Sequence, residues 1–360
     1  MKPGPIVLLT ALAMLTAFTG ASAPPKNYTA ELRKATQSIQ RKQWPQALKM
    51  LDGLLKKHKE PELVKELTLH RIRCLAGAAD HPAAVAEAVK LQGLFPQDKD
   101  VQSKAMLLQG DSLRGQKKFP EAIVVYRKLA KDHAAYADRA ADALGRAGDV
   151  YCSDLKKYPE GLAVYAEVAK TFAANTSRAA DAVLRAAGVN QTLVKDMPKA
   201  AAGYLALCEK YADVYDERNK SIFYTKAVDC LRAAKKLPEA QAVAAKAEKA
   251  LPSMSYKSPQ AIRQVDLLME MKKYPQARAQ VDRIICAYPL AATTCQPAQL
   301  RAVGAWRAES KFAEAAGAAR ILYNAAGDEK SIREAAHAVA MAFRSVDGNL
   351  GRANEFLSYQ

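Results

Sequence analysis

Hydrophobic residues recur at helical spacing along the chain, in blocks that are separated by short polar turns. In residues 119–132, Ile123, Tyr126, Leu129 and Ala130 fall on one face of a helix, and residues 103–116 contain a second helical block just before it. Alanine is very common and aromatic residues make up only 7% of the chain. This composition favours helices that pack closely over sheets. The pattern therefore predicts pairs of helices joined by tight turns.

A motif at these turns repeats along the whole chain. Its clearest forms are KKFPEA (117–122), KKYPEG (156–161), KKLPEA (235–240) and KKYPQA (272–277). The large residue of the motif, called the anchor below, recurs at intervals of 37 to 40 residues as Trp44, His81, Phe119, Tyr158, Met197, Leu237, Tyr274, Phe312 and Leu350. Three positions later stands a small residue: Ala47, Ala84, Ala122, Gly161, Ala200, Ala240, Ala277, Ala315 and Ala353. Such a period is typical of a solenoid.

The residue types of the motif have physical causes. Proline follows the anchor in the first seven copies, and proline suits the first turn of a helix. The anchor can fold back on the helix that it precedes, and the small residue one turn later permits a close neighbour. Gly110, Gly148 and Gly188 take matching places in the preceding helices and predict close backbone approach there. The fourth copy has one extra residue in its turn.

The stretch FPEAIVVYRKLAKDHAAYADRAADALGRAGDVY (119–151) resembles a tetratricopeptide repeat, and the resemblance extends over residues 28–360. The large residue expected late in the second helix is present as Leu51, Tyr126, Tyr165, Tyr204, Val281 and Leu357. The sequence pattern of the repeats is similar to that of bacterial periplasmic repeats of the TolA-binding and outer-membrane-assembly type. They depart from the family in a period longer than 34, in lysines where Gly-Asp is usual, and in degenerate copies one, two, eight and nine. The resemblance implies an all-α, right-handed α-solenoid of about nine repeats, continuous over residues 24–360.

The same resemblance implies a concave groove lined by the first helix of each pair. The groove positions, five or eight residues before the anchors, hold Arg73, Asp111, Arg114, Asp229, Arg232, Asp266 and Arg307. Arginine forks bind carboxylates bidentately, so these residues are candidates for binding a protein or peptide partner. Alternatively, they pair with one another across neighbouring helices.

The chain is strongly basic, with a formal net charge of +17. Lysine pairs occupy four equivalent turns: Lys117, Lys118, Lys156, Lys157, Lys235, Lys236, Lys272 and Lys273. Equivalent turns of a solenoid lie along one edge, so a basic ridge is expected. The ridge is a candidate dock for an acidic partner, an anionic lipid surface or a glycan. The alternative is that the lysines solvate a tight turn and interact with the C-terminal end of the first helix.

The six cysteines have no spacing typical of a metal site. Cys74 and Cys230 fall where the repeat needs a small packed residue, which favours buried, inert thiols. Cys286 and Cys295 stand nine positions apart at consecutive helix ends, and a disulfide between them would close a short loop.

Residues 1–23 read as a secretory signal peptide, with Lys2, an apolar run and a small-residue cleavage site that ends at Ala23 or Ala21. We therefore expect an exported protein that is periplasmic or extracellular and free of the membrane. No catalytic, cofactor or metal motif is present, so we expect neither an enzyme nor a cofactor, and no nucleic-acid partner. The leading interpretation is a scaffold for protein or peptide partners in cell-envelope assembly. The second is a module that docks on an anionic envelope polymer or lipid through the basic ridge.

Overall fold

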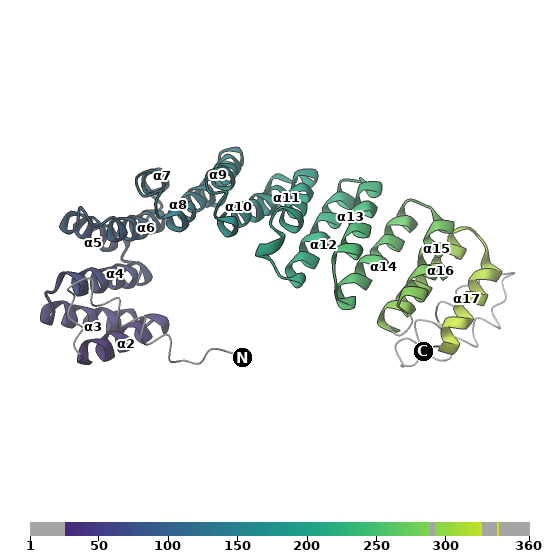
Figure 1. Ribbon diagram of the computed structural model, residues 1–360, viewed down its shortest axis with the longest axis horizontal. Coiled ribbons are helices and arrows are strands. Elements are labelled where there is room, and N and C mark those ends of the chain that lie inside the picture. The colour runs from purple at the N-terminus through teal and green to yellow at the C-terminus, as the bar shows by residue number, and fades with distance from the viewer. Residues whose placement is uncertain (1–25, 289–291, 326–336, 338–360) are drawn as a thin grey trace. The chain divides into compact units, whose positions relative to one another are not determined.

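The computed structural model describes residues 26–288, 292–325 and 337, and all regular elements within them are helices (Figure 1). The chain divides into two compact units at the boundary between Val164 and Tyr165. The all-α repeat predicted from the sequence is confirmed. One continuous array over residues 24–360 and the right-handed sense of the solenoid stay predictions, and the proposed signal peptide lies outside the described residues.

The first unit is a series of helical hairpins. Its elements are α2 (Lys26–Gln40), α3 (Trp44–Lys57), α4 (Pro61–Gly77), α5 (His81–Leu94), α6 (Lys99–Gly115), α7 (Phe119–Asp132), α8 (Ala137–Asp149), η1 (Val150–Asp154) and the start of α9 (Tyr158–Thr171). Consecutive helices from α2 to α8 pack against each other, and the first helices of successive hairpins also touch, α4 with α6 and α6 with α8. The first helices thus form a common face.

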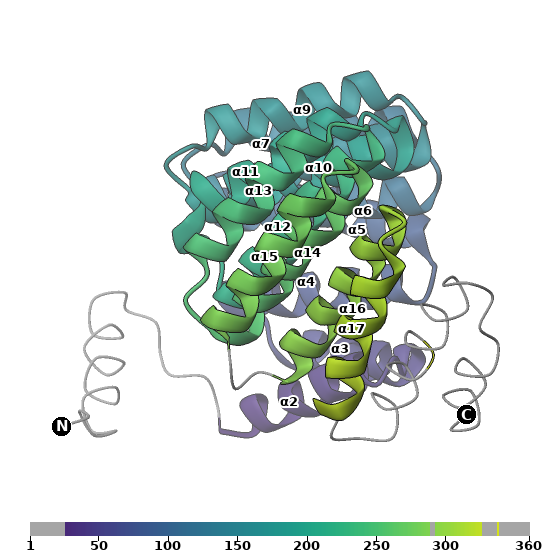
Figure 2. The same ribbon diagram turned by 90° about the vertical axis from the view of Figure 1, so that its right-hand side faces the viewer.

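The second unit continues the same order after α9. It contains α10 (Thr176–Val189), η2 (Asn190–Val194), α11 (Met197–Glu209), η3 (Ala212–Val214), α12 (Glu217–Ala233), α13 (Leu237–Ala250), α14 (Met254–Glu270), α15 (Tyr274–Ala287), α16 (Ala292–Ala308) and α17 (Phe312–Ala325). Here α12 touches α14, and α14 touches α16. Figure 2 shows α11, α13 and α15 on one side of this unit and α12 and α14 on the other.

The repeat motif begins the second helix of every described hairpin. All eight described anchors are the first residue of a helix, from Trp44 of α3 to Phe312 of α17, and each is half-buried. The small residue three positions later is buried in all eight copies. The predicted motif is confirmed in these copies, while Leu350, Ala353 and Leu357 of the ninth lie outside the described residues.

The turn before each anchor has one backbone conformation throughout. The residue two positions before the anchor has a φ between 58° and 64°, in the left-handed region. It is Lys42, Ala79, Lys117, Lys156, Lys195, Lys235, Lys272 or Ser310. At Lys117 the amide donates to the Arg114 carbonyl and that of Lys118 donates to the Leu113 carbonyl, each at 2.9 Å. This is the glycine-type end of a helix made with lysine.

A π-helix accommodates the extra residue of copy four, which lies at the end of the first helix and not in the turn as predicted, and copy five has a second π-helix. The helices α4, α6, α12, α14 and α16 each have 17 residues. In contrast, α8 has 13 residues and continues into the five-residue η1, and α10 has 14 and continues into the five-residue η2. A π-helical turn accommodates one added residue. Therefore Lys156 and Lys195 still stand two positions before their anchors.

The mid-helix glycines do not share one cause. A Cβ on Gly110 would lie 2.5 Å from the ring of Tyr126, so the close approach there is made by a side chain. The carbonyl of Gly148 lies 3.0 Å from the place of a Cβ on Gly161, which fits the predicted backbone approach. For Gly188 the prediction is wrong, because a Cβ there would meet nothing within 4 Å.

A second large residue, which the sequence analysis missed, follows the end of each second helix. It stands fourteen positions after the anchor and is His58, Phe95, His133, Phe172, Tyr211, Leu251 or Tyr288. The last five are at most 9% exposed, and His58 and Phe95 are half-buried. This residue is called the wedge below, and Phe95, Tyr211 and Tyr288 each pack in or against a core cluster. In the described part of the first unit the wedge is histidine at two of three places.

Candidate partner-binding face

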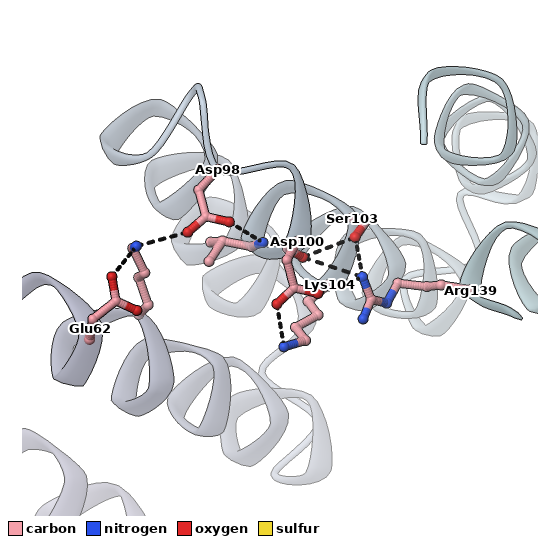
Figure 3. A network of polar contacts seen from close by, with 8 residues as sticks. Glu62, Asp98, Asp100, Ser103, Lys104 and Arg139 are labelled. Atoms are coloured by element: carbon pink, nitrogen blue, oxygen red, sulfur yellow. Dashed lines mark hydrogen bonds and ion pairs between the residues drawn. The ribbon is translucent and has the colours of Figure 1, made fainter. Parts of the chain in front are cut away.

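In the first unit, ion pairs connect the first helices near their N-terminal ends (Figure 3). Lys65 of α4 lies 2.6 Å from Glu62 and 2.8 Å from Asp98, and Asp98 accepts the Val101 amide at the start of α6. The hydrogen bond from Lys65 is the largest cause that lowers the pKa of Asp98. These contacts hold α4 to α6.

The same network continues to the next hairpin. Arg139 of α8 lies 3.1 Å from Asp100 of α6 and also donates to the hydroxyl of Ser103. Because Ser103 is fully buried, this contact ties α8 to the interior of the preceding first helix. The N-terminal ends of α4, α6 and α8 are thus linked in one chain of polar contacts.

Two of the predicted groove residues lie further along this face. Arg146 of α8 donates through Nη1 to both carboxylate oxygens of Asp111 at 2.7 Å, and the Tyr126 hydroxyl donates to Asp111 at 2.6 Å. Burial, and then the charge of Asp111, raises the pKa of Tyr126. Nε of Arg114 donates to Asp154 at 2.7 Å. Both groove residues are therefore engaged by the next hairpin.

Three of the predicted groove residues of the second unit also pair with residues of the next hairpin. Asp229 lies 3.5 Å from Nη1 of Arg263, Arg232 pairs with Glu270, and Asp266 receives Nε and Nη2 of Arg301. Each pair joins a first helix to the next one, as the pairing alternative predicts, although the partners are other residues than the predicted set. Arg73 is exposed on α4. Arg307 is half-buried on α16, and its Nε has no hydrogen-bond partner among the described residues.

An open hollow of about 520 Å³ lies between α14 and α16, on the face of the first helices. Its lining is Ser255, Ser258, Pro259, Ile262, Arg263, Asp266, Thr294 and Arg301. Pro259 stands inside α14 and has no amide hydrogen, so the Ser255 carbonyl loses its helical partner. Pro297 takes the same place in α16, fifteen residues before its anchor. The hollow thus combines a carbonyl without its usual helical donor, hydroxyls and an apolar wall.

Two arginines face this hollow in different states. Arg301 is held by Asp266 and by the Pro297 carbonyl, to which its Nη1 donates at 2.9 Å. Arg263 has only the longer contact to Asp229, and its buried Nε has no hydrogen-bond partner among the described residues. The Arg263 side chain is 33% exposed, so its guanidinium beside Ile262 and Pro259 suits a carboxylate that carries an apolar group. Sequence reasoning missed this site, although the equivalent prolines were a visible signal.

A second polar network of the second unit lies in its interior. Glu248 of α13 is 8% exposed and accepts hydrogen bonds of 2.7 Å from Gln264, Arg283 and Tyr288. Burial alone would raise the pKa of Glu248, but the bonds from Arg283, Tyr288 and Gln264 lower it. This carboxylate links α13, α14 and α15.

The predicted ridge lysines are all exposed. Four belong to the first unit and four to the second, and within each unit they occupy equivalent turns. Lys236 pairs with Glu239 at 3.0 Å, and Lys156 donates to the Ser153 carbonyl at 2.6 Å. The first lysine of each pair holds the left-handed turn position, which disfavours residues with a Cβ and therefore does not explain the choice of lysine. A docking role for the ridge stays a prediction.

All six cysteines are free thiols in the structure. Cys74 and Cys230 are buried as predicted, and burial raises the pKa of Cys74 to about 11. Cys286 is exposed, and the Cys295 thiol donates to the Tyr288 carbonyl at 3.1 Å. A bond between Cys286 and Cys295 stays a prediction.

Among the described residues there is no group of His, Cys, Asp and Glu arranged to hold a metal ion, and no helix is long and apolar enough to cross a membrane.

No protein-family model and no curated protein matches the chain. Among solved structures it is similar to the apo form of RapI, with 13% identity, coverage of 93% of this chain and 96% of the other, and a TM-score of 0.41. NprR in complex with its cognate peptide NprX gives 14% identity, 94% and 98% coverage and a TM-score of 0.35. A tetratricopeptide repeat protein from Parabacteroides merdae gives 12% identity, coverage of 89% of this chain and 100% of the other, and a TM-score of 0.34. The tetratricopeptide-type repeat predicted from the sequence is confirmed, since eight helices begin at the predicted anchors. The TolA-binding resemblance stays a prediction.

Proposed function

We propose that the protein is an exported, non-enzymatic scaffold that binds a protein or peptide partner on the first-helix face of its second unit, within cell-envelope assembly. The observation that carries the proposal is the hollow between α14 and α16, where the Arg263 side chain is 33% exposed beside apolar side chains and makes only a 3.5 Å contact to Asp229. A partner carboxylate can bind the exposed part of this guanidinium, and an apolar side chain next to that carboxylate can contact Ile262. Export follows from the sequence pattern of residues 1–23.

The test is a selection of peptides from a display library, followed by calorimetry on the full-length chain. We expect Arg263→Ala to weaken the selected peptides at least about tenfold, because a charge-assisted hydrogen bond contributes about 1.5–3 kcal/mol. Arg218→Ala, an exposed arginine on α12, is the matched control and should change the affinity less than twofold. Equal affinities for Arg263→Ala and wild type would exclude the hollow as the binding site.

The ridge of exposed turn lysines supports a second candidate, docking on an anionic envelope polymer or lipid surface. Salt separates the two candidates, because exposed charges are screened within about 3 Å at 1 M ionic strength. Binding in the hollow should persist at 0.5 M salt, whereas binding by the ridge should be lost. Charge reversal of Lys117, Lys118, Lys156 and Lys157 should abolish only the second activity.

A further inference from the structure

The first hairpin carries an unusual density of positive charge. Residues 26–60 contain nine lysines and arginines but only three aspartates and glutamates. This hairpin therefore holds more than a third of the net charge of the chain in about a tenth of its length. None of the ridge lysines belongs to it.

A groove of about 490 Å³ runs between α2 and α3 of this hairpin. Its lining is Glu31, Lys34, Gln46, Lys49, Met50, Gly53, Leu54 and Lys57. The residues from α3 recur at three- and four-residue spacing, so they form one stripe along the helix. Asp52 lies on another side of α3, where it pairs with Arg71 of α4 at 2.8 Å. The groove is thus separate from the packing surface between the first and second hairpins.

The floor of the groove is apolar and contains open space. Leu54 is 1% exposed, and Met50 packs against the same core cluster. A Cβ on Gly53 would meet nothing within 4 Å. A glycine inside a helix costs about 1 kcal/mol relative to alanine, and no neighbour in the described chain requires one here. Gly77 differs, because a Cβ there would lie 2.7 Å from the ring of Trp44.

The rim of the groove is positively charged. Lys57 pairs with Glu31 at 3.2 Å across the groove, and both side chains are largely exposed, so the pair contributes little. Lys34 and Lys49 are exposed and have no acidic partner within the described residues. A ligand with carboxylates on both sides of an apolar strip would complement this surface.

We propose that the α2–α3 groove binds an acidic amphipathic helix of a partner protein. From Gln46 to Lys57 the groove follows α3 for about 16 Å, which matches three turns of a bound helix. Apolar residues at positions i, i+3 or i+4, and i+7 of that helix contact Met50, Gly53 and Leu54. Its carboxylates contact Lys34, Lys49 and Lys57. The recessed apolar floor favours such a helix over a flat membrane surface or a polysaccharide. The site is independent of the hollow between α14 and α16.

The experiment selects binders from a display library of random 16-residue peptides on the full-length chain, with counter-selection on Gly53→Leu. The Cβ of the leucine meets nothing within 4 Å, the rest of its side chain occupies groove space, and the charge is unchanged. We expect the enriched peptides to be acidic, with apolar residues at helical spacing. Fluorescence polarisation of an enriched peptide should show a loss of affinity of at least about tenfold for Gly53→Leu and for the Lys34→Glu, Lys49→Glu double variant.

Two matched controls distinguish binding in the groove from nonspecific electrostatic attraction to the basic chain. Gly93→Leu places the same side chain on α5, where a Cβ also meets nothing within 4 Å, and Lys90→Glu with Lys131→Glu reverses two exposed lysines elsewhere in the first unit. Both controls should bind within about twofold of wild type. Circular dichroism confirms that each variant stays helical, and Arg263→Ala should leave this binding unchanged.

Three results would overturn the proposal. The first is that no peptide is enriched over the counter-selection, or that enriched peptides lack acidic residues. The second is that the control variants weaken binding as much as the groove variants, which would indicate general electrostatic attraction. The third is that vesicles of phosphatidylglycerol and phosphatidylcholine bind the chain through Lys34 and Lys49 while peptides do not, which would assign the groove to a membrane surface.

Discussion

The two units build similar hairpins, and in both units ion pairs join successive first helices, but the second unit also has an interior carboxylate network and an open hollow. In the first unit, ion pairs run over the face of the first helices, where Asp98, Asp100 and Asp111 each receive a cation from another helix. In the second unit, a carboxylate network lies in the interior around Glu248. The first-helix face there keeps an open hollow in which Arg263 is only partly engaged.

This difference shows how one repeat can serve two purposes. Where partner charges of neighbouring first helices meet at short distances, the face is closed and mainly joins the hairpins. Where the prolines of α14 and α16 open backbone carbonyls and an arginine lacks a full partner, the same face can accept a ligand. The repeat motif itself is the same in both units, so function depends on the residues between the anchors.

The largest effect is expected from the buried network of the second unit. Glu248→Ala removes the acceptor of Arg283, Tyr288 and Gln264, and we expect the free energy of unfolding to fall by about 3 kcal/mol. Urea denaturation measures the loss. Glu239→Ala on the same helix is the control, since its pair with Lys236 is exposed and should contribute less than about 0.5 kcal/mol. Equal effects of the two changes would show that the interior network adds no stability.

The pH dependence of this effect has a definite sign. Because the pKa of Glu248 is lowered from its ordinary 4.5 in the folded chain, its stabilisation is complete above that value. It is lost as the pH falls through the folded pKa. The difference between wild type and Glu248→Ala should therefore shrink below pH 4.5 and stay constant from pH 6 to 8.

The closed face of the first unit gives the next largest effect. Asp111→Ala leaves the buried hydroxyl of Tyr126 without its acceptor and removes one of the two carboxylates that Arg146 contacts, the other being Asp142, which should cost about 2 kcal/mol. Asp266→Ala in the second unit breaks only the pair with Arg301, and its cost should be about 1 kcal/mol. Thermal unfolding of both variants measures the contrast. If Asp266→Ala were the more damaging change, the distinction between a closed and an open face would be wrong.

The wedge of the first unit at His133 is a histidine, so this unit should lose stability at low pH. Burial lowers the pKa of His133 from its ordinary 6.5. The charge of Asp132 raises this pKa, and the charges of Lys99, Arg139 and Lys128 lower it. The neutral form is favoured in the folded chain, so stability is complete above pH 6.5 and falls as the pH drops below it. His133→Phe should stabilise the protein more at pH 5.5 than at pH 7.5, and the unfolded pKa of 6.5 limits this difference to about 1.4 kcal/mol. A stability difference that is the same at both pH values would contradict this role of His133.

The sequence predicted the elements well because their signals are local. Anchors, prolines and small residues are fixed by the turn and by the first contact of a helix, so Phe119 and Ala122 could be placed without knowledge of the neighbours. The partners of Asp111 and Asp266 could not be placed, because they depend on the register between hairpins. The groove around Gly53 was missed because the sequence of the α2–α3 hairpin does not show which side of α3 the neighbouring helices leave uncovered.

The smallest effect is one in which the two units should not differ. Lys117 and Lys235 hold the same left-handed turn position, with φ of 60° and 59°. A left-handed conformation costs a residue with a Cβ about 1 kcal/mol, and glycine avoids this cost but loses more entropy on folding. Lys117→Gly and Lys235→Gly should therefore each stabilise the protein by about 0.5 kcal/mol. Lys118→Gly is the control, because its φ of −84° gives glycine no advantage, and it should be destabilising. Opposite signs for Lys117→Gly and Lys235→Gly would show that the turns of the two units are not equivalent.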